Sequence, residues 1–200
     1  MNEATKKTGW GCGMMIAAAF GILVMLMLMG GCGVYGTVVS LRNSNTDVDG
    51  KYAQLDNMLE RKAKLVPNLV ATVKGYAKHE QAVFGHVAEA RSKLLNAQTP
   101  VEKGAANDGL NMALGRLLML TENYPQLKAD KHFTGLMDEL AGSENRIATA
   151  RMDYNNTVAR FNKRLNSPIN SVIASAVNLR PREFFSASAE ARANNVKVEF

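Results

Sequence analysis

Cysteine is scarce in this chain: it occurs only at Cys12 and Cys32. Twenty residues of helix would hold the two thiols roughly 30 Å apart, so they cannot form a disulfide within one chain. The sequence after residue 32 therefore has neither a disulfide framework nor a thiolate site for a metal ion.

Histidine is nearly as rare, with only His79, His86 and His132. His79 and His86 would share a helix face, but the paired-histidine spacing of helical zinc proteases, with its glutamate, is missing. There is no glycine-rich phosphate loop between a strand and a helix, and no serine in a nucleophile elbow. The sequence assigns no catalytic residue, no metal ligand and no cofactor, and we predict a protein that is not an enzyme.

Charge is absent from a long stretch near the start. No Asp, Glu, Lys or Arg occurs from Thr8 to Leu41, and residues 14–29 are apolar apart from one glycine. The 26 residues from 14 to 39 would make a helix of roughly 39 Å, longer than the hydrocarbon core of about 30 Å. We predict a short polar tail over residues 1–13 and a single transmembrane helix over residues 14–41.

An alternative reading of the same stretch is a secretion signal. Lys6 and Lys7 precede the apolar run, and residues 29–32 (MGGC) loosely resemble a lipoprotein cleavage box, which would make Cys32 a lipidation site. Against this, the box has Met where Leu is usual, and apolar residues continue past Cys32. An uncleaved span is the favoured interpretation.

Glycine is concentrated in and around the predicted span. Because small residues let neighbouring helices approach closely, we expect copies of the chain to associate there as a homo-oligomer. The flanking charges do not choose an orientation: Lys6 and Lys7 favour keeping the N-terminus inside, whereas Arg42 and Lys51 favour the reverse. The side of the membrane that holds the soluble domain stays open. The glycines are Gly9, Gly11, Gly13, Gly21, Gly30, Gly31, Gly33 and Gly36.

Basic residues outnumber acidic ones by 24 to 18, which gives a formal net charge of +6. The two signs are interspersed, as where Glu60 precedes Arg61, and no stacking aromatics accompany the basic residues. We therefore expect no nucleic-acid partner. A lipid bilayer with an anionic surface is the partner that the basic excess fits.

Beyond residue 42 the pattern is that of soluble helices, and we predict one helical domain over residues 42–185. Residues 43–50 read as a polar hinge, followed by a long amphipathic helix from Val48 to Val87 with a kink at Pro67. Residues 96–109 read as a connector to a shorter helix at residues 110–118, which Tyr124-Pro125 ends.

The strongest periodicity follows, with core positions alternating between spacings of four and three. Ser167-Pro168 then resembles an N-cap with a first-turn proline that opens a last helix. Four soluble helices and no strand signal predict an all-α fold: an antiparallel four-helix bundle with long helices, then a flexible tail over residues 186–200. The stripe comprises Phe133, Met137, Leu140, Glu144, Ile147, Arg151, Tyr154, Val158, Phe161 and Leu165.

Two charges, Glu144 and Arg151, interrupt this stripe. A charge on a buried seam costs several kcal/mol unless it is paired, so we expect each to meet groups on other helices, or the stripe to reach solvent there. Asn155 and Asn162 repeat a seven-residue step, and we expect their amides to tie helix to helix. Structural use of these four residues is favoured over a polar functional site.

Four separated blocks of sequence, in order, carry a resemblance to one family. The blocks are 61–80 (RKAKLVPNLV then TVKGYA and HE), 122–129 (ENYP, LKA), 144–162 (ENRIA, AR, YN, V, FN) and 168–185 (P, IA, FF). The resemblance is to the LemA family of bacterial membrane proteins, over about residues 35–185. It implies a single N-terminal membrane helix that carries antiparallel helices at the bacterial cell membrane, and it supplies no catalytic residue. The Gly- and Cys-rich N-terminus departs from the family's plainer aliphatic span.

The leading hypothesis is a membrane-anchored, non-enzymatic helical protein of the bacterial envelope, a self-associating scaffold or interaction module. An alternative is an accessory subunit of an envelope enzyme or protease complex that docks envelope protein partners along residues 122–131.

Overall fold

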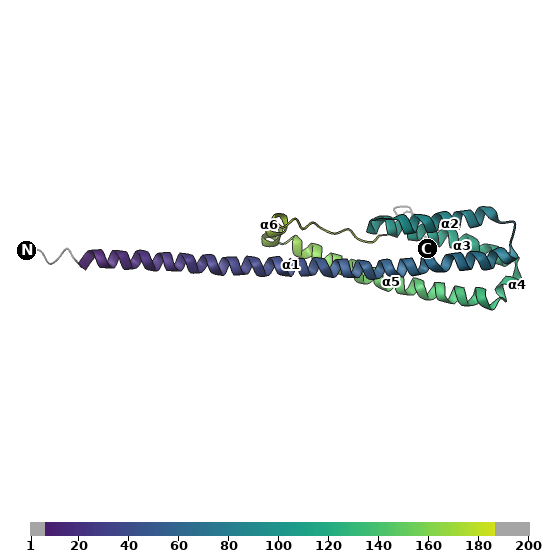
Figure 1. Ribbon diagram of the computed structural model, residues 1–200, viewed down its shortest axis with the longest axis horizontal. Helices are drawn as coiled ribbons and strands as arrows, with labels where there is room; N and C mark the ends of the chain where they lie inside the picture. Colours follow the sequence, from purple (N-terminus) through teal and green to yellow (C-terminus); the bar gives the residue numbers. More distant parts are fainter. Residues whose placement is uncertain (1–6, 187–200) are drawn as a thin grey trace, which may run out of the picture. The chain divides into compact units, whose positions relative to one another are not determined.

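The computed structural model describes residues 7–186, without the side chains of residues 7–16, 24, 26, 28–30 and 32. Within that range every regular element is helical, so the predicted all-α class is confirmed. Figure 1 shows the elements in chain order, with an extended segment after the last helix. They are α1 (Lys7–Tyr76), α2 (Gln81–Asn96), α3 (Pro100–Leu120), the 3-10 turn η1 (Thr121–Asn123), α4 (Pro125–Lys128), α5 (Lys131–Leu165) and α6 (Pro168–Ala176).

The chain divides into two compact units. Unit 1 holds the residues up to Ser44 together with Arg164–Arg180, and unit 2 holds Asn45–Lys163 together with the chain from Pro181 onward. Unit 1 therefore contains the first part of α1 and all of α6, and unit 2 contains α2, α3, α4 and most of α5.

Helix α1 corrects two boundaries predicted from the sequence. It begins at Lys7 and runs unbroken through residues 43–50, where a hinge was expected. Those residues are poor helix formers, but Leu41 and Val48 on either side are 2% and 1% exposed, and tertiary burial outweighs weak propensity. The helix ends at Tyr76 rather than at Val87. The prediction placed this end too late because the apolar spacing continues across the four-residue turn that leads into α2.

The predicted span at residues 14–41 falls within α1, although several of its side chains, including that of Cys32, lie outside the described residues. Among the side chains that the structure describes, no helix has the length and apolar character needed to cross a membrane. The C-terminal residues 187–200 of the predicted tail also lie outside the described residues.

Pro67 lies inside α1 without ending it. Proline has no N–H to donate, so the carbonyl of Ala63, four residues earlier, loses its helical partner. The Nε–H of Arg91, on α2, donates to that carbonyl at 2.8 Å. A side chain from the neighbouring helix thus replaces the hydrogen bond that Pro67 removes.

The α2–α3 connection is much shorter than the predicted connector at residues 96–109. Helix α3 already begins at Pro100, with Thr99 as N-cap in a complete capping box. The Thr99 hydroxyl accepts from the N–H of Glu102 at 3.2 Å, and the Glu102 carboxylate accepts from the N–H of Thr99 at 3.1 Å. Residues 104 and 109 are glycines within the helix, which made the segment resemble a loop.

Helices α2 and α3 pack against each other, and α1, α2, α3 and α5 each contribute buried apolar residues to unit 2. The expected N-cap and first-turn proline at Ser167-Pro168 are confirmed as the start of α6. The core includes Leu55, Leu59, Val66, Leu69, Val73, Val87, Leu94, Leu110, Leu117, Ile147, Tyr154, Val158 and Phe161, each at most 3% exposed.

Candidate functional site

A lysine is completely buried in the core of unit 2. Lys62 on α1 is 0% exposed, and its Nζ donates to Asn107 Oδ1 at 2.8 Å and to Asn111 Oδ1, both on α3. The same ammonium forms an ion pair with Glu144 on α5. Burial lowers the pKa of Lys62, and the hydrogen bond and charge of Glu144 act in the opposite direction.

This cluster explains why Glu144 interrupts the apolar stripe of α5. Its carboxylate is the counter-charge of an ammonium from another helix, so the charge at this position of the stripe is paired. The sequence analysis missed Lys62, although the signal was present: residue 62 continues the core spacing of Leu55 and Leu59 toward Val66.

Arg151 corrects the predicted stripe. Its side chain is exposed, whereas Ala150 beside it is 6% exposed and takes the inward position at that turn. Position 151 therefore reaches solvent, as the alternative reading of the stripe allowed, although Val158, seven residues later, is buried again.

The sequence analysis expected Asn155 and Asn162 to join two helices. In the structure, both instead bind the extended segment that follows α6. The Nδ2 of Asn155 donates to the carbonyl of Phe185 and its Oδ1 accepts the N–H of Phe185, both at 2.9 Å. Asn162 makes the same pair of bonds with residue Arg182, at 2.9 and 2.8 Å. We call these two residues the asparagine clamp.

The spacing of the asparagine clamp matches an extended peptide. The seven-residue step from Asn155 to Asn162 rises roughly 10.5 Å along the helix, and the three-residue step from 182 to 185 spans roughly 10 Å when the chain is extended. Between the two, the Tyr154 hydroxyl donates to the carbonyl of Glu183 at 2.8 Å. Burial raises the pKa of Tyr154 to about 12. Helix α5 thus forms hydrogen bonds with the backbone of this segment at residues 182, 183 and 185.

The side chain of Arg182 adds a contact with α1 in unit 2. Its Nε–H donates to Asn45 Oδ1 at 3.0 Å, and its guanidinium pairs with Asp49. At the far end of the segment, Ser186 lies against α3: a Cβ added to Gly104 would meet the Ser186 carbonyl oxygen at 2.3 Å. Glycine at position 104 therefore allows this close approach.

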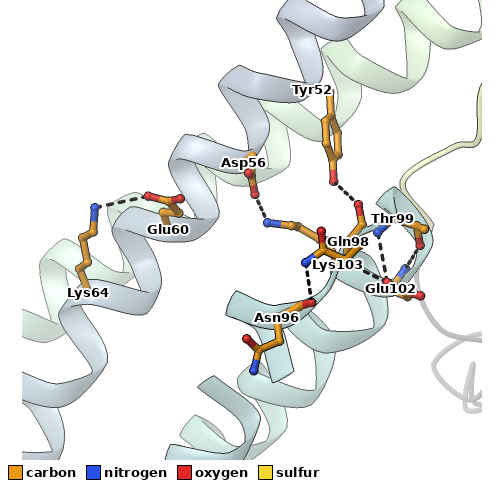
Figure 2. A network of polar contacts seen from close by, with 9 residues as sticks. All are labelled: Tyr52, Asp56, Glu60, Lys64, Asn96, Gln98, Thr99, Glu102 and Lys103. Atoms are coloured by element: carbon orange, nitrogen blue, oxygen red, sulfur yellow. Dashed lines mark hydrogen bonds and ion pairs between the residues drawn. The ribbon is translucent and has the colours of Figure 1, made fainter. Parts of the chain in front are cut away.

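Figure 2 shows a second polar junction of unit 2, between α1 and the start of α3. Lys103, only 8% exposed, pairs with Asp56, and the Tyr52 hydroxyl donates to the Gln98 carbonyl at 3.5 Å. The Tyr52 ring in turn lies 5.6 Å, between centroids, from that of Tyr154. The junction therefore connects the capped start of α3 to the tyrosine beside the asparagine clamp.

The carboxylates with shifted pKa values serve helix ends and surface pairs. The backbone N–H groups of Gln98 and Thr99 lower the pKa of Glu102, and Lys93 lowers that of Glu89. Both carboxylates line an open groove of about 810 Å³ along α2 and α3, in which small side chains alternate with larger polar and charged ones. Among the described residues, no three His, Cys, Asp or Glu side chains gather closely enough to hold a metal ion.

The fold and site define the class of protein: an all-helical chain whose buried polar groups join helices and hold an extended segment. The chain belongs to the LemA family, whose sequence profile matches residues 51–200. The match takes in Lys62, Glu144 and both residues of the asparagine clamp. It also extends through the predicted tail at residues 186–200.

Individual relatives are distant. Magnetosome protein MamQ 2 of Paramagnetospirillum magneticum is 26% identical over 154 residues, which cover 64% of this chain and 56% of the relative. Magnetosome protein MamQ of Magnetospirillum gryphiswaldense is 25% identical over 142 residues, 58% of this chain and 52% of the relative. Protein LemA of Metamycoplasma hominis is 26% identical over 133 residues, 64% of this chain and 59% of the relative. The chain thus spans less than two thirds of the length of these relatives.

Proposed function

We propose that the protein is a membrane-anchored, non-enzymatic scaffold of the bacterial envelope. Residues 14–41 of α1 cross the membrane once, and α1, α2, α3 and α5 of unit 2 form an antiparallel bundle that carries the interaction surfaces. The charge-free, apolar start of α1 is the observation on which this proposal mainly depends.

The apolar side chains of that segment point in every direction around α1. At about 100° per residue, residues 20, 22, 23, 25 and 27 lie at roughly 0°, 200°, 300°, 140° and 340° around the helix axis. A helix that is apolar on all sides is stable in lipid and unfavourable in water. The five side chains are Phe20, Ile22, Leu23, Met25 and Met27, which are between 55% and 74% exposed.

The glycines of the same segment support self-association. A Cβ added at Gly21, Gly31, Gly33 or Gly36 would meet nothing within 4 Å, so packing within the chain does not require glycine there. Their value lies in letting the helix of a second copy come close. We infer a homo-oligomer held through this glycine-rich part of α1.

The use of polar groups in unit 2 favours binding over catalysis. Lys62 and Glu144 form an ion pair with each other, and the asparagine clamp is hydrogen-bonded to the peptide backbone. The carboxylates with lowered pKa values are held ionised by neighbours, unlike a general acid, whose pKa is raised.

The anchor is tested by alkaline carbonate extraction of bacterial membranes that contain the full chain. We expect the native protein to stay in the membrane pellet. Leu23→Arg combined with Met25→Arg should move it to the supernatant, since each arginine costs about 2.5–3.5 kcal/mol at the centre of a span. The matched control, Met112→Arg, changes a methionine on α3 that is 63% exposed and should leave the protein in the pellet.

A native protein that carbonate extracts completely would contradict the proposal. Mass spectrometry of the N-terminus separates a span from lipidation: a chain that begins upstream of Cys32 supports the span, and a diacylglyceryl-modified Cys32 at the N-terminus supports the lipoprotein alternative.

A further inference from the structure

Helix α6 exposes an apolar face. Ile169 is 74% exposed and Val172 is 71% exposed, and residues three apart lie on the same side of a helix. The opposite side is packed, since Ala174 is 4% exposed. Unit 1 therefore has two branched aliphatic side chains that none of the described residues covers.

Contacts within unit 1 fix where this face lies along α1. The guanidinium of Arg164, at the end of α5, donates to Ser44 Oγ at 2.7 Å and to Ser40 Oγ at 3.4 Å. The Nδ2 of Asn170 donates to the carbonyl of Arg164 at 2.9 Å, which holds the first turn of α6 against that corner. Leu41 is 2% exposed here. Helix α6 is therefore held at the level where the charge-free stretch of α1 ends.

That level is where a membrane surface would be. The 26 residues from 14 to 39 exceed the length needed for the hydrocarbon core, so the last turns of the stretch reach the headgroup region. Tyr35, 71% exposed, is a side chain that favours this depth.

We propose that α6 is a second membrane contact, which lies on the bilayer surface and inserts Ile169 and Val172 among the lipid chains at headgroup depth. The partner is anionic lipid: Arg164 and Arg180, which flank α6 in the sequence, are exposed cations that would favour a negatively charged surface. This inference rests on the proposed anchor in α1, and adds a surface contact that the anchor does not require.

The test places a single tryptophan on α6. Trp10 is the one tryptophan of the chain, so the experiment uses the full chain with Trp10→Phe and Val172→Trp. The protein is reconstituted into vesicles of phosphatidylcholine and phosphatidylglycerol whose acyl chains carry bromine close to the headgroup. The matched control is Trp10→Phe with Met152→Trp, because Met152 is 58% exposed on α5.

We expect brominated lipid to quench the tryptophan at position 172 at least twofold and to leave that at position 152 unchanged. Equal quenching at the two positions, or none at position 172, would overturn the inference. A blue-shifted emission at position 172 without quenching would also overturn it, since protein, such as a second copy, would then cover this face.

Vesicle flotation keeps the two proposals distinct. If the protein floats with the vesicles and position 172 is not quenched, the anchor stands and the α6 contact is wrong. If the protein does not float, both are wrong. In addition, Arg180→Gln should still float but should weaken the preference for anionic over neutral vesicles, whereas an unchanged preference would count against the anionic-lipid partner of α6.

Discussion

Lys62 shows how one residue can decide whether a core is stable. Its ammonium has no access to solvent and satisfies two asparagines and one carboxylate, so its loss leaves three polar groups without their partner. Breaking a buried pair on one side costs about 3–5 kcal/mol, and the lower end applies because Glu144 is partly exposed.

We predict that Lys62→Met lowers the free energy of unfolding by about 3 kcal/mol. Urea titration of the full chain in detergent, followed by circular dichroism, measures this. The control, Lys64→Met, removes a lysine whose side chain is 75% exposed and should change stability by less than about 0.5 kcal/mol. An equal decrease in the free energy of unfolding for the two variants would show that the buried contacts of Lys62 do not stabilise the core.

Tyr154 provides a prediction about alkaline pH. Its pKa in the folded protein is about 12, above the usual tyrosine value of about 10, because burial disfavours the phenolate. The unfolded chain therefore releases this proton first as the pH rises. The stabilising contribution is complete below pH 10 and is lost as the pH rises from 10 to 12.

In Tyr154→Phe this titration is removed, so stability should fall less steeply between pH 10 and 12 than in the native protein. Denaturant midpoints measured across that range provide the check. The substitution also deletes the bond to Glu183, so the comparison uses the slope with pH rather than the absolute stability. Identical slopes would argue against a raised pKa at Tyr154.

At the level of single elements, the extended segment after α6 depends on two side chains of α5. The N–H groups of Arg182 and Phe185 both donate to the asparagine clamp. Each neutral hydrogen bond contributes about 0.5–1.5 kcal/mol. Asn155→Ala with Asn162→Ala should therefore release residues 182–185 and leave the helices folded.

Limited trypsin digestion detects that release as faster cleavage after Arg182, by roughly tenfold or more, which corresponds to about 1.4 kcal/mol. Asn156→Ala, at the exposed neighbouring position, is the control and should cleave at the native rate. An unchanged rate in the double variant would mean that other contacts suffice to hold the segment.

The proline in α1 allows a test by paired substitution. Arg91→Met leaves the Ala63 carbonyl without a partner and should cost about 1–3 kcal/mol. In a Pro67→Ala background the same change should cost less than half as much, because the N–H of an alanine at position 67 can donate to that carbonyl. Urea unfolding of the four proteins gives the coupling energy, and a value of zero would refute the compensation.

For the molecule as a whole, the prediction concerns association of copies. Gly33→Leu with Gly36→Leu should at least halve the yield of chemically crosslinked dimer in native membranes, because the larger side chains keep two α1 helices apart. The matched control, Gly135→Leu, alters an exposed glycine on α5 where an added Cβ also meets open space. A dimer yield that is insensitive to all three changes would exclude this face.

Periodicity predicted the helical class and most of the buried residues, since Leu55, Leu69 and Ile147 lie in the core as their spacing required. It failed where tertiary contacts override local signals: Leu41 and Val48 hold the polar stretch 43–50 in α1, and an apolar spacing that persists across residues 77–80 concealed a turn.

The candidate site was only partly accessible from the sequence. The seven-residue step from Asn155 to Asn162 marked the correct residues, but their partner is an irregular segment that carries no period of its own. Lys62 escaped notice because lysine is expected at the surface, and only its position among leucines indicated otherwise.

The asparagine clamp binds peptide groups and makes no demand on the side chains that they carry. Glu183 and Phe184, which lie between the clamped positions, are exposed, so the clamp places no requirement on their side chains. Proline would break the clamp at residues 182 and 185, because it lacks the N–H that donates to Asn162 or Asn155. Other side chains, such as part of a short epitope, could thus be introduced at residues 183 and 184 while the path of the backbone is kept.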